Sequence, residues 1–155
     1  MAEYIYPAPG SAGAVTLTLK ASGDTTGLVV PSLQDVTVNN ANDVFTWTQL
    51  DQGSKLQIAT TATNSLSMNI VLDQDTFFGV TTADEAAKTS GIFGLSKDKT
   101  LVTFDLTMGP ESDGGAGKTL SGSAYITGLA PTVSADSPVW VSPITLTVSG
   151  DYTVA

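Results

Sequence analysis

The feature that most constrains the fold is the strict alternation of apolar and polar residues in the run ITLTVS (144–149) near the end of the chain. Successive side chains of a β-strand point to opposite faces of the sheet, so this run predicts one buried face and one polar face. The polar positions hold only Thr and Ser, which offer no group that would start a reaction. The sequence therefore predicts a two-faced sheet whose polar face carries no obvious chemistry.

The same pattern recurs along the chain and predicts a fold made mainly of β-strands. In TLVTFDLTM (100–108), one face carries four apolar side chains, and the other carries Asp105 between two Thr residues. The apolar four, expected to point into the core, are Val102, Phe104, Leu106 and Met108. Strand signals also occur in VTLTLK (15–20), LVV (28–30), LQDVTV (33–38), KLQIAT (55–60), LSMNIVL (66–72) and TLSGSAYITGLA (119–130). This order favours a single domain over 1–155, a β-sandwich or β-barrel with one flanking α-helix.

The one helix is expected from about Ala83 to about Ile92. Thr82 followed by Glu85 matches a capping box, in which the two side chains satisfy free N–H groups at a helix start. Ala and Lys favour the helical segment, and Gly91 or a later Gly could end it.

The first 14 residues contain two Pro and two Gly and predict an extended N-terminal arm. Tyr4 and Tyr6 could anchor this arm on a neighbouring subunit. A disordered tail is the alternative interpretation of the same composition.

Residues 39–55 form the least regular segment and are expected to make a long loop. Turn-forming residues stand at both of its ends, and Phe45, Trp47 and Leu50 lie near its middle. Such an excursion is either a hairpin that packs on its own domain or an arm that reaches a partner.

The charge balance argues against a protein that holds nucleic acid tightly. The chain has 15 acidic and 6 basic residues, a net charge of −9, and its cations are all Lys. Tight binding to phosphates needs a basic patch, for which Arg is the preferred residue. An acidic surface would instead repel DNA and anionic lipid.

Cysteine is absent, which excludes disulfides and thiolate sites and fits folding in a reducing cytoplasm. The N-terminal segment lacks the basic start and apolar run of a signal peptide. No apolar segment approaches the roughly 18 residues that a membrane span requires. We therefore expect a chain made in the cytoplasm with no membrane partner.

Motifs for chemistry are weak. GGAGKT (114–119) ends like a phosphate-binding loop, but Ser112 replaces the first Gly and a strand pattern follows where a helix is needed. Asp73 and Asp75 have a spacing that could bind Ca²⁺, yet the other ligands of a calcium loop are missing. Without His or Cys, the commonest general base and the thiol nucleophile are unavailable. We expect no metal, no cofactor and no enzymatic activity.

The last third of the chain resembles the tail tube proteins of long-tailed bacteriophages. Those chains commonly run through a strand, a helix and a strand, then a paired segment and a final alternating strand that ends near a Gly. The counterparts here are LSMNIVL (66–72), ADEAAKTSGIFG (83–94), TLVTFDLTM (100–108), LSGSAYITGLAPTVS (120–134) and VWVSPITLTVSG (139–150). The resemblance covers about residues 60–155, and residues 1–60 match in order of elements only. The non-contractile siphophage type is expected; a contractile-tail tube and the type VI secretion tube remain alternatives.

The resemblance implies a structural role. In this family six subunits form a ring, their sheets join into a barrel around a channel, and the rings stack into a hollow tube with the helices outside. DNA passes through the channel without specific binding, which suits an acidic wall. Further partners would be tape measure, tail terminator and baseplate or tip proteins. The protein would be found in the virion tail after assembly in the host cytoplasm.

Candidate residues follow from the resemblance and the strand pattern together. The candidates for lining the channel are Asp35, Asp73 and Asp105. The candidates for contacts between subunits or rings are Tyr4, Tyr6, Phe45, Trp47 and Leu50.

Two other function classes share this composition. A capsid decoration protein, or another virion surface protein, would also be acidic, β-rich and free of Cys, but would need no central channel. A carbohydrate-binding module would present Trp47 and Trp140 on an exposed platform for stacking against sugars.

Overall fold

A computed structural model describes residues 15–30, 33–51, 53–109 and 117–155. The expected N-terminal arm, with Tyr4 and Tyr6, lies outside the described residues.

Nine strands form one antiparallel sheet, which confirms the predicted mainly-β fold. The strands are β1 (Val15–Ala21), β2 (Leu28–Val30), β3 (Leu33–Thr48), β4 (Lys55–Val71), β5 (Val102–Met108), β6 (Lys118–Leu129), β7 (Thr132–Ser134), β8 (Ser137–Val148) and β9 (Thr153–Val154). Their order is β2-β1-β5-β6-β8-β4-β3, with β7 beside β8 and β9 beside β6. Among the described residues the sheet is therefore open, with β2 and β3 at its edges, where a sandwich or closed barrel was expected.

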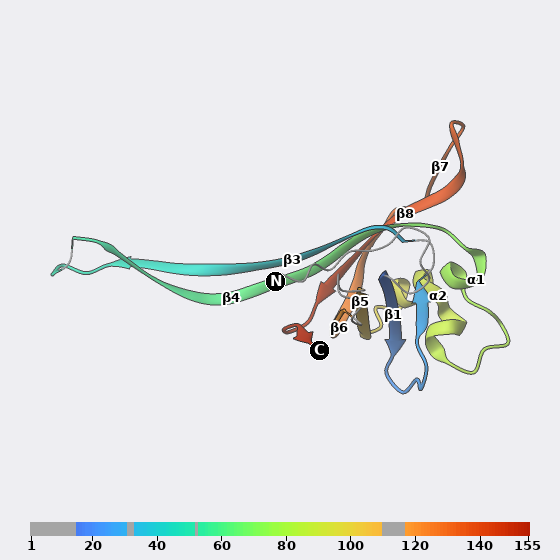
Figure 1. The fold of residues 1–155 in the computed structure, drawn as a ribbon, viewed down its shortest axis with the longest axis horizontal. Helices are drawn as coiled ribbons and strands as arrows, with labels where there is room; N and C mark the ends of the chain where they lie inside the picture. Colours follow the sequence, from blue (N-terminus) through green and yellow to red (C-terminus); the bar gives the residue numbers. More distant parts are fainter. Residues whose placement is uncertain (1–14, 31–32, 52, 110–116) are drawn as a thin grey trace.

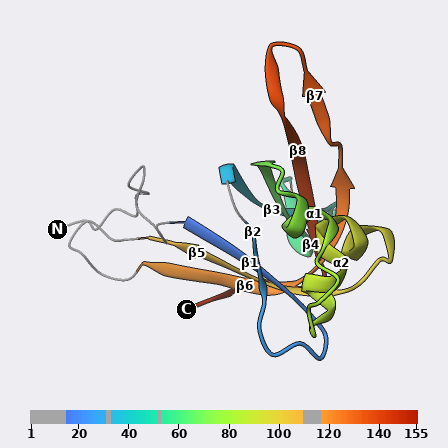
Figure 2. The same ribbon diagram turned by 90° about the vertical axis from the view of Figure 1, so that its right-hand side faces the viewer.

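The sheet bends within β6. A register irregularity falls between Ile126 and Gly128, inside the part of β6 that pairs with β8 and beyond the part (118–124) that pairs with β5. An extra residue in one strand bends that strand and increases its local twist. As a result, β1, β5 and β6 run across the direction of β8 (Figure 2).

The core lies between the apolar face of this bent sheet and two short helices. Alternate residues of paired strands meet in register, as Leu17 does with Leu106 and Leu19 with Phe104, and all four side chains are fully buried. Of the four residues of β5 expected to face inward, Met108 at the strand end is only partly buried. Burial of such side chains is the main favourable term in folding.

The helices differ from the expected single helix over Ala83–Ile92. The structure has two helices in its described part, α1 (Gln74–Phe78) and α2 (Ala86–Lys97), so α2 begins and ends later than predicted. Gly91 does not end α2 but kinks it, with φ 64° and ψ −179°. A Cβ on Gly91 would lie 2.5 Å from the amide nitrogen of Gly79, so the close approach of the two helices requires glycine here.

The expected capping box is wrong, because Thr82 and Glu85 do not cap α2. Asp24, in the turn between β1 and β2, caps the helix instead: its two carboxylate oxygens accept hydrogen bonds from the amides of Ala86 (3.1 Å) and Ala87 (2.9 Å). Glu85 reaches back to the same turn and accepts hydrogen bonds from the amide and hydroxyl groups of Thr25 and Thr26. The turn and the helix start thus satisfy each other's free donors.

Two hairpins project from the body in different directions (Figure 1). The long hairpin, formed by β3 and β4, extends far to one side of the molecule, and the shorter hairpin of β7 and β8 rises beside the helices. The segment 39–55, expected as a long loop, is mostly strand: it contains the outer part of β3, a short turn and the first residue of β4.

Candidate assembly surfaces

The first candidate surface is the polar face of the sheet, opposite the core. It includes Thr16, Thr18, Lys20, Asp35, Thr37, Ser65, Ser67, Asn69, Thr103, Asp105, Thr107, Ser121, Ser123, Thr145 and Thr147, together with the exposed Val29 and Tyr125. Small hydroxyl side chains dominate this face, so it has few groups that could grip a ligand or start a reaction.

Asp105 and Asp35 both lie on this polar face. Asp105 is exposed at the middle of β5, between Thr18 of β1 and Ser121 of β6. Asp35 lies opposite Asn69 on the neighbouring strands β3 and β4, and both of its carboxylate oxygens accept hydrogen bonds from the Asn69 amide (3.0 and 2.9 Å). The structure therefore brings two of the three predicted channel residues onto one face.

Asp73 lies elsewhere. It precedes α1, is exposed, and accepts a hydrogen bond from the Thr76 hydroxyl at 3.0 Å. Since α1 packs against α2 and β2, Asp73 belongs to the helical end of the molecule and not to the polar face.

The second candidate surface is the outer part of the long hairpin. The register places Phe45 opposite Ile58 and Trp47 opposite Leu56, so the four side chains share one face, which we call the hairpin-end face. The rings of Phe45 and Trp47 stack with their centroids 5.9 Å apart. Phe45 is 59% exposed and Ile58 is 55% exposed, and Leu50 in the turn is fully exposed.

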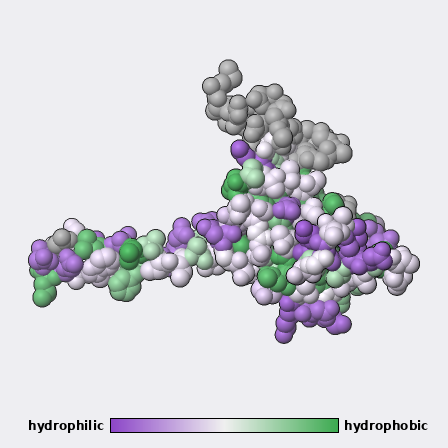
Figure 3. Space-filling view, turned by 90° about the horizontal axis from the view of Figure 1, so that it is seen from below, coloured by the Kyte–Doolittle hydropathy of each residue, from purple (hydrophilic) through white to green (hydrophobic). Residues whose placement is uncertain are grey.

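In the described part of the chain, the hairpin-end face projects beyond the body, and Phe45 and Ile58 on it are exposed. In Figure 3, apolar residues (green) lie along the hairpin where it projects away from the body. Sequence reasoning named Phe45, Trp47 and Leu50 but missed Leu56 and Ile58. The alternation in KLQIAT (55–60), paired across the preceding turn with FTW (45–47), could have identified them.

The root of the long hairpin is held by the C-terminal segment. The Tyr152 hydroxyl lies 2.7 Å from the carbonyl oxygen of Asn39 and 3.0 Å from that of Ser65, and both carbonyls are within reach as acceptors of its hydrogen bond. The buried side chain of Asn64 donates to the carbonyl of Gly150 at 2.9 Å. Burial raises the pKa of Tyr152, which keeps its hydroxyl available as a donor. These contacts fix the direction in which the hairpin leaves the body.

The third candidate surface is a groove at the opposite end of the molecule, which we call the end groove. It lies between α1 and the β7–β8 hairpin, has a volume of about 740 Å³, and carries Asp73 at its wall. Its apolar lining comprises Val71, Leu72, Phe78, Pro131, Pro138, Val139 and Trp140. Trp140 is 52% exposed and Phe78 is 60% exposed, which is unusual for large apolar side chains without a partner.

Two structural features are absent from the described residues. They contain no group of three acidic, His or Cys side chains placed to hold a metal ion. Within the same ranges, no helix has the length and apolar character needed to cross a bilayer.

Comparison with known proteins gives a clear likeness in structure and none in sequence. No protein-family model and no curated protein matches this chain. The structure of the SPP1 tail tube superposes with a TM-score of 0.66 at 12% identity, covering 93% of this chain and 77% of that one. The tail of an empty gene transfer agent particle, solved with C6 symmetry, gives a TM-score of 0.64 at 12% identity and covers 94% and 98%.

A third similar structure comes from the baseplate of the anti-feeding prophage, symmetrised six-fold. It has a TM-score of 0.65 at 9% identity and covers 96% of each chain. Three particles of different kinds thus contain a subunit with this arrangement of strands and helices over nearly the whole chain. The chain has the fold found in the tail tube of SPP1 and in the tail of the gene transfer agent.

Proposed function

We propose that this protein is a structural subunit that forms hexameric rings, and that these rings stack into the hollow tail tube of a phage-like particle. The observation that carries the proposal is the match, over more than nine-tenths of the chain, to subunits of the SPP1 tail tube and of a tail with C6 symmetry. A fold alone does not fix a function, so the surfaces must also suit the role.

The polar face suits the wall of a channel through which DNA slides. It is built of small hydroxyl side chains with Asp105 and Asp35 among them, and the whole chain carries a net charge of −9. A carboxylate repeated six times around a ring repels phosphates within the screening distance of about 8 Å at physiological salt. Asp73, at the helical end, is less suited to this position than the other two.

The open sheet and the long hairpin suit assembly. The edges at β2 and β3 leave backbone groups through which the sheets of neighbouring subunits can join. The hairpin-end face, with Leu50 beside it, would be buried on another subunit or ring. Tyr4 and Tyr6 are proposed to contribute to the same contacts. A structural role of this kind needs no catalytic group.

The finer partners follow from the same proposal. A tail tube begins on a baseplate or tip, encloses a tape measure protein and ends at a terminator, so these are the expected partners in the virion tail. Assembly would take place in the host cytoplasm, and the non-contractile type is the one that we favour.

The proposal is tested by negative-stain microscopy of the purified protein, alone and after addition of tail-tip complexes as nuclei. Rings with six-fold symmetry, or tubes, are expected. Compact trimers without a channel would favour the alternative, a capsid decoration protein, and persistent monomers under both conditions would contradict the tube subunit.

A further inference from the structure

We propose that the end groove of one copy is the receptor for the hairpin-end face of a second copy. This inference rests on the proposed function and names the two surfaces that meet between subunits. Each surface is apolar, and in the described part of the chain its large side chains are exposed: Phe45 and Ile58 on one side, Trp140 and Phe78 on the other.

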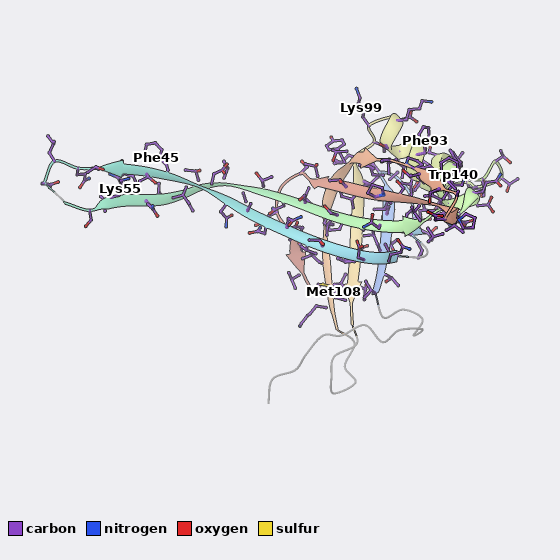
Figure 4. The ribbon with its side chains drawn as sticks, turned by 90° about the horizontal axis from the view of Figure 1, so that it is seen from above. Phe45, Lys55, Phe93, Lys99, Met108 and Trp140 are labelled. Carbon is purple, nitrogen blue, oxygen red and sulfur yellow. The ribbon has the colours of Figure 1, made fainter. Side chains whose placement is uncertain are left out.

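The two surfaces cannot meet within one chain. Figure 4 shows Phe45 and Trp140 at opposite ends of the molecule. The strands of the long hairpin are paired along most of their length, with an irregularity between Asn42 and Val44, and the contacts of Tyr152 and Asn64 hold its root, so its end lies far from the end groove of its own subunit (Figure 4). An occupant that presents Phe45, Trp47, Leu56 and Ile58 to the groove must therefore be another copy.

Charge also favours this occupant. Lys55 is the one basic residue between Lys20 and Lys88 in the sequence, and it lies next to Leu56 at the end of the hairpin. The wall of the end groove carries Asp73, and Asp75 is exposed in the same α1 segment. Docking the hairpin end would thus bring Lys55, which shares the hairpin tip with Asp51, to an acidic wall that has no basic residue in its lining.

The contact is heterologous, since it joins two different surfaces of the same chain. Each docking event leaves one free hairpin and one free groove, so the contact repeats until a ring closes or a filament grows. This property distinguishes it from a two-fold contact, which would stop at a dimer.

The absence of native cysteine allows a direct test by cross-linking. One preparation carries Ile58→Cys and a second carries Val139→Cys; they are mixed, assembled and treated with a short bifunctional thiol reagent. Matched controls replace the second variant with Thr103→Cys on the polar face or Met108→Cys at the end of β5. The inference predicts cross-linked pairs with Val139→Cys and not with either control.

Charge exchange gives an independent readout that needs no cysteine. Lys55→Glu should weaken association by up to roughly fivefold for each contact, as should Asp73→Lys, and a mixture of the two variants should regain association through the swapped pair. Lys99→Glu makes the same change in net charge away from the groove lining and should have no such effect.

The outcomes separate this inference from the proposed function. Rings or tubes could form while Ile58→Cys cross-links to a control site or to nothing and charge exchange gives no recovery. In that case the groove is not the receptor, and the proposed function as a tube subunit is unaffected. If the native protein forms neither rings nor tubes, the proposed function and this inference are both contradicted.

Discussion

The contact between Tyr152 and the root of the long hairpin gives the most specific prediction of stability. Tyr152→Phe keeps the ring, which lies edge-on to Phe104 with centroids 6.3 Å apart, and removes only the hydroxyl. That hydroxyl is shared by the carbonyls of Asn39 and Ser65, so the change removes the equivalent of one hydrogen-bond donor.

The expected magnitude follows from the value of one partly buried hydrogen bond. Its net contribution is about 0.5–1.5 kcal/mol. For a domain of this size, 1 kcal/mol lowers Tm by roughly 2–4 °C. Tyr152→Phe should therefore lower Tm by a few degrees, whereas Tyr125→Phe, on an exposed ring, should leave it unchanged.

A second readout reports the direction of the hairpin. Spin labels on Gln57→Cys in the hairpin and Ser123→Cys in the body would give a distance distribution that broadens in the Tyr152→Phe background. A Tm and a distribution both equal to those of the native chain would refute the conclusion that Tyr152 fixes the hairpin.

Four further predictions test other parts of the structure. Trp47→Ala should lower the affinity between subunits by about thirtyfold, or 2 kcal/mol, while the Tm of the unassembled protein stays unchanged; loss of the monomer's fold would place Trp47 in the core. Asp105→Lys should preserve tubes but slow DNA ejection, most strongly at low salt, and equal ejection rates at two ionic strengths would remove Asp105 from the channel wall. Hydrogen bonds from Thr25 and Thr26 lower the pKa of Glu85 from 4.5 to about 2, so the stabilisation by Glu85 is present above pH 4.5 and is lost as the pH falls toward 2. Glu85→Gln should therefore flatten this part of the curve of unfolding free energy against pH. An unchanged curve would contradict the contact. Gly91→Ala should lower the urea midpoint of unfolding more than the control Gly53→Ala does, because a Cβ on Gly53 would meet nothing within 4 Å. Equal midpoints would contradict the close approach of the helices.

The parts of the fold that could be predicted from the sequence are those in which side chains alternate within one strand. β5 is the clearest case, because the burial of Val102, Phe104 and Leu106 follows directly from their spacing. The length of the long hairpin could not be predicted, because residues 39–43 place polar side chains on both faces around Ala41 and give no period. The outer parts of its strands are specified by pairing with each other, whereas the inner part of β4 has a buried face at Leu66, Met68 and Ile70.

The helix boundaries and the end groove depend on contacts between distant residues. The N-terminus of α2 is set by Asp24, far away in the sequence, so the local pair of Thr82 and Glu85 was misleading. The end groove forms only where α1 meets the β7–β8 hairpin, which comes from the other end of the chain and contributes Trp140. No local pattern brings these segments together. The candidate channel residues Asp35 and Asp105 share a face for a local reason: Asp105 lies between the buried Phe104 and Leu106, and Asp35 lies beside the partly buried Val36.

The central claim is that the polar face of the sheet lines a channel formed by six copies of this chain. A cryo-electron microscopy reconstruction of the assembled protein tests it most directly, because it places each face relative to the axis. The account predicts a hollow tube with six copies in each ring, Asp105 and the Thr-rich face toward the axis, and α1 and α2 outside. A tube with the polar face outward, or a compact assembly without a channel, would contradict it.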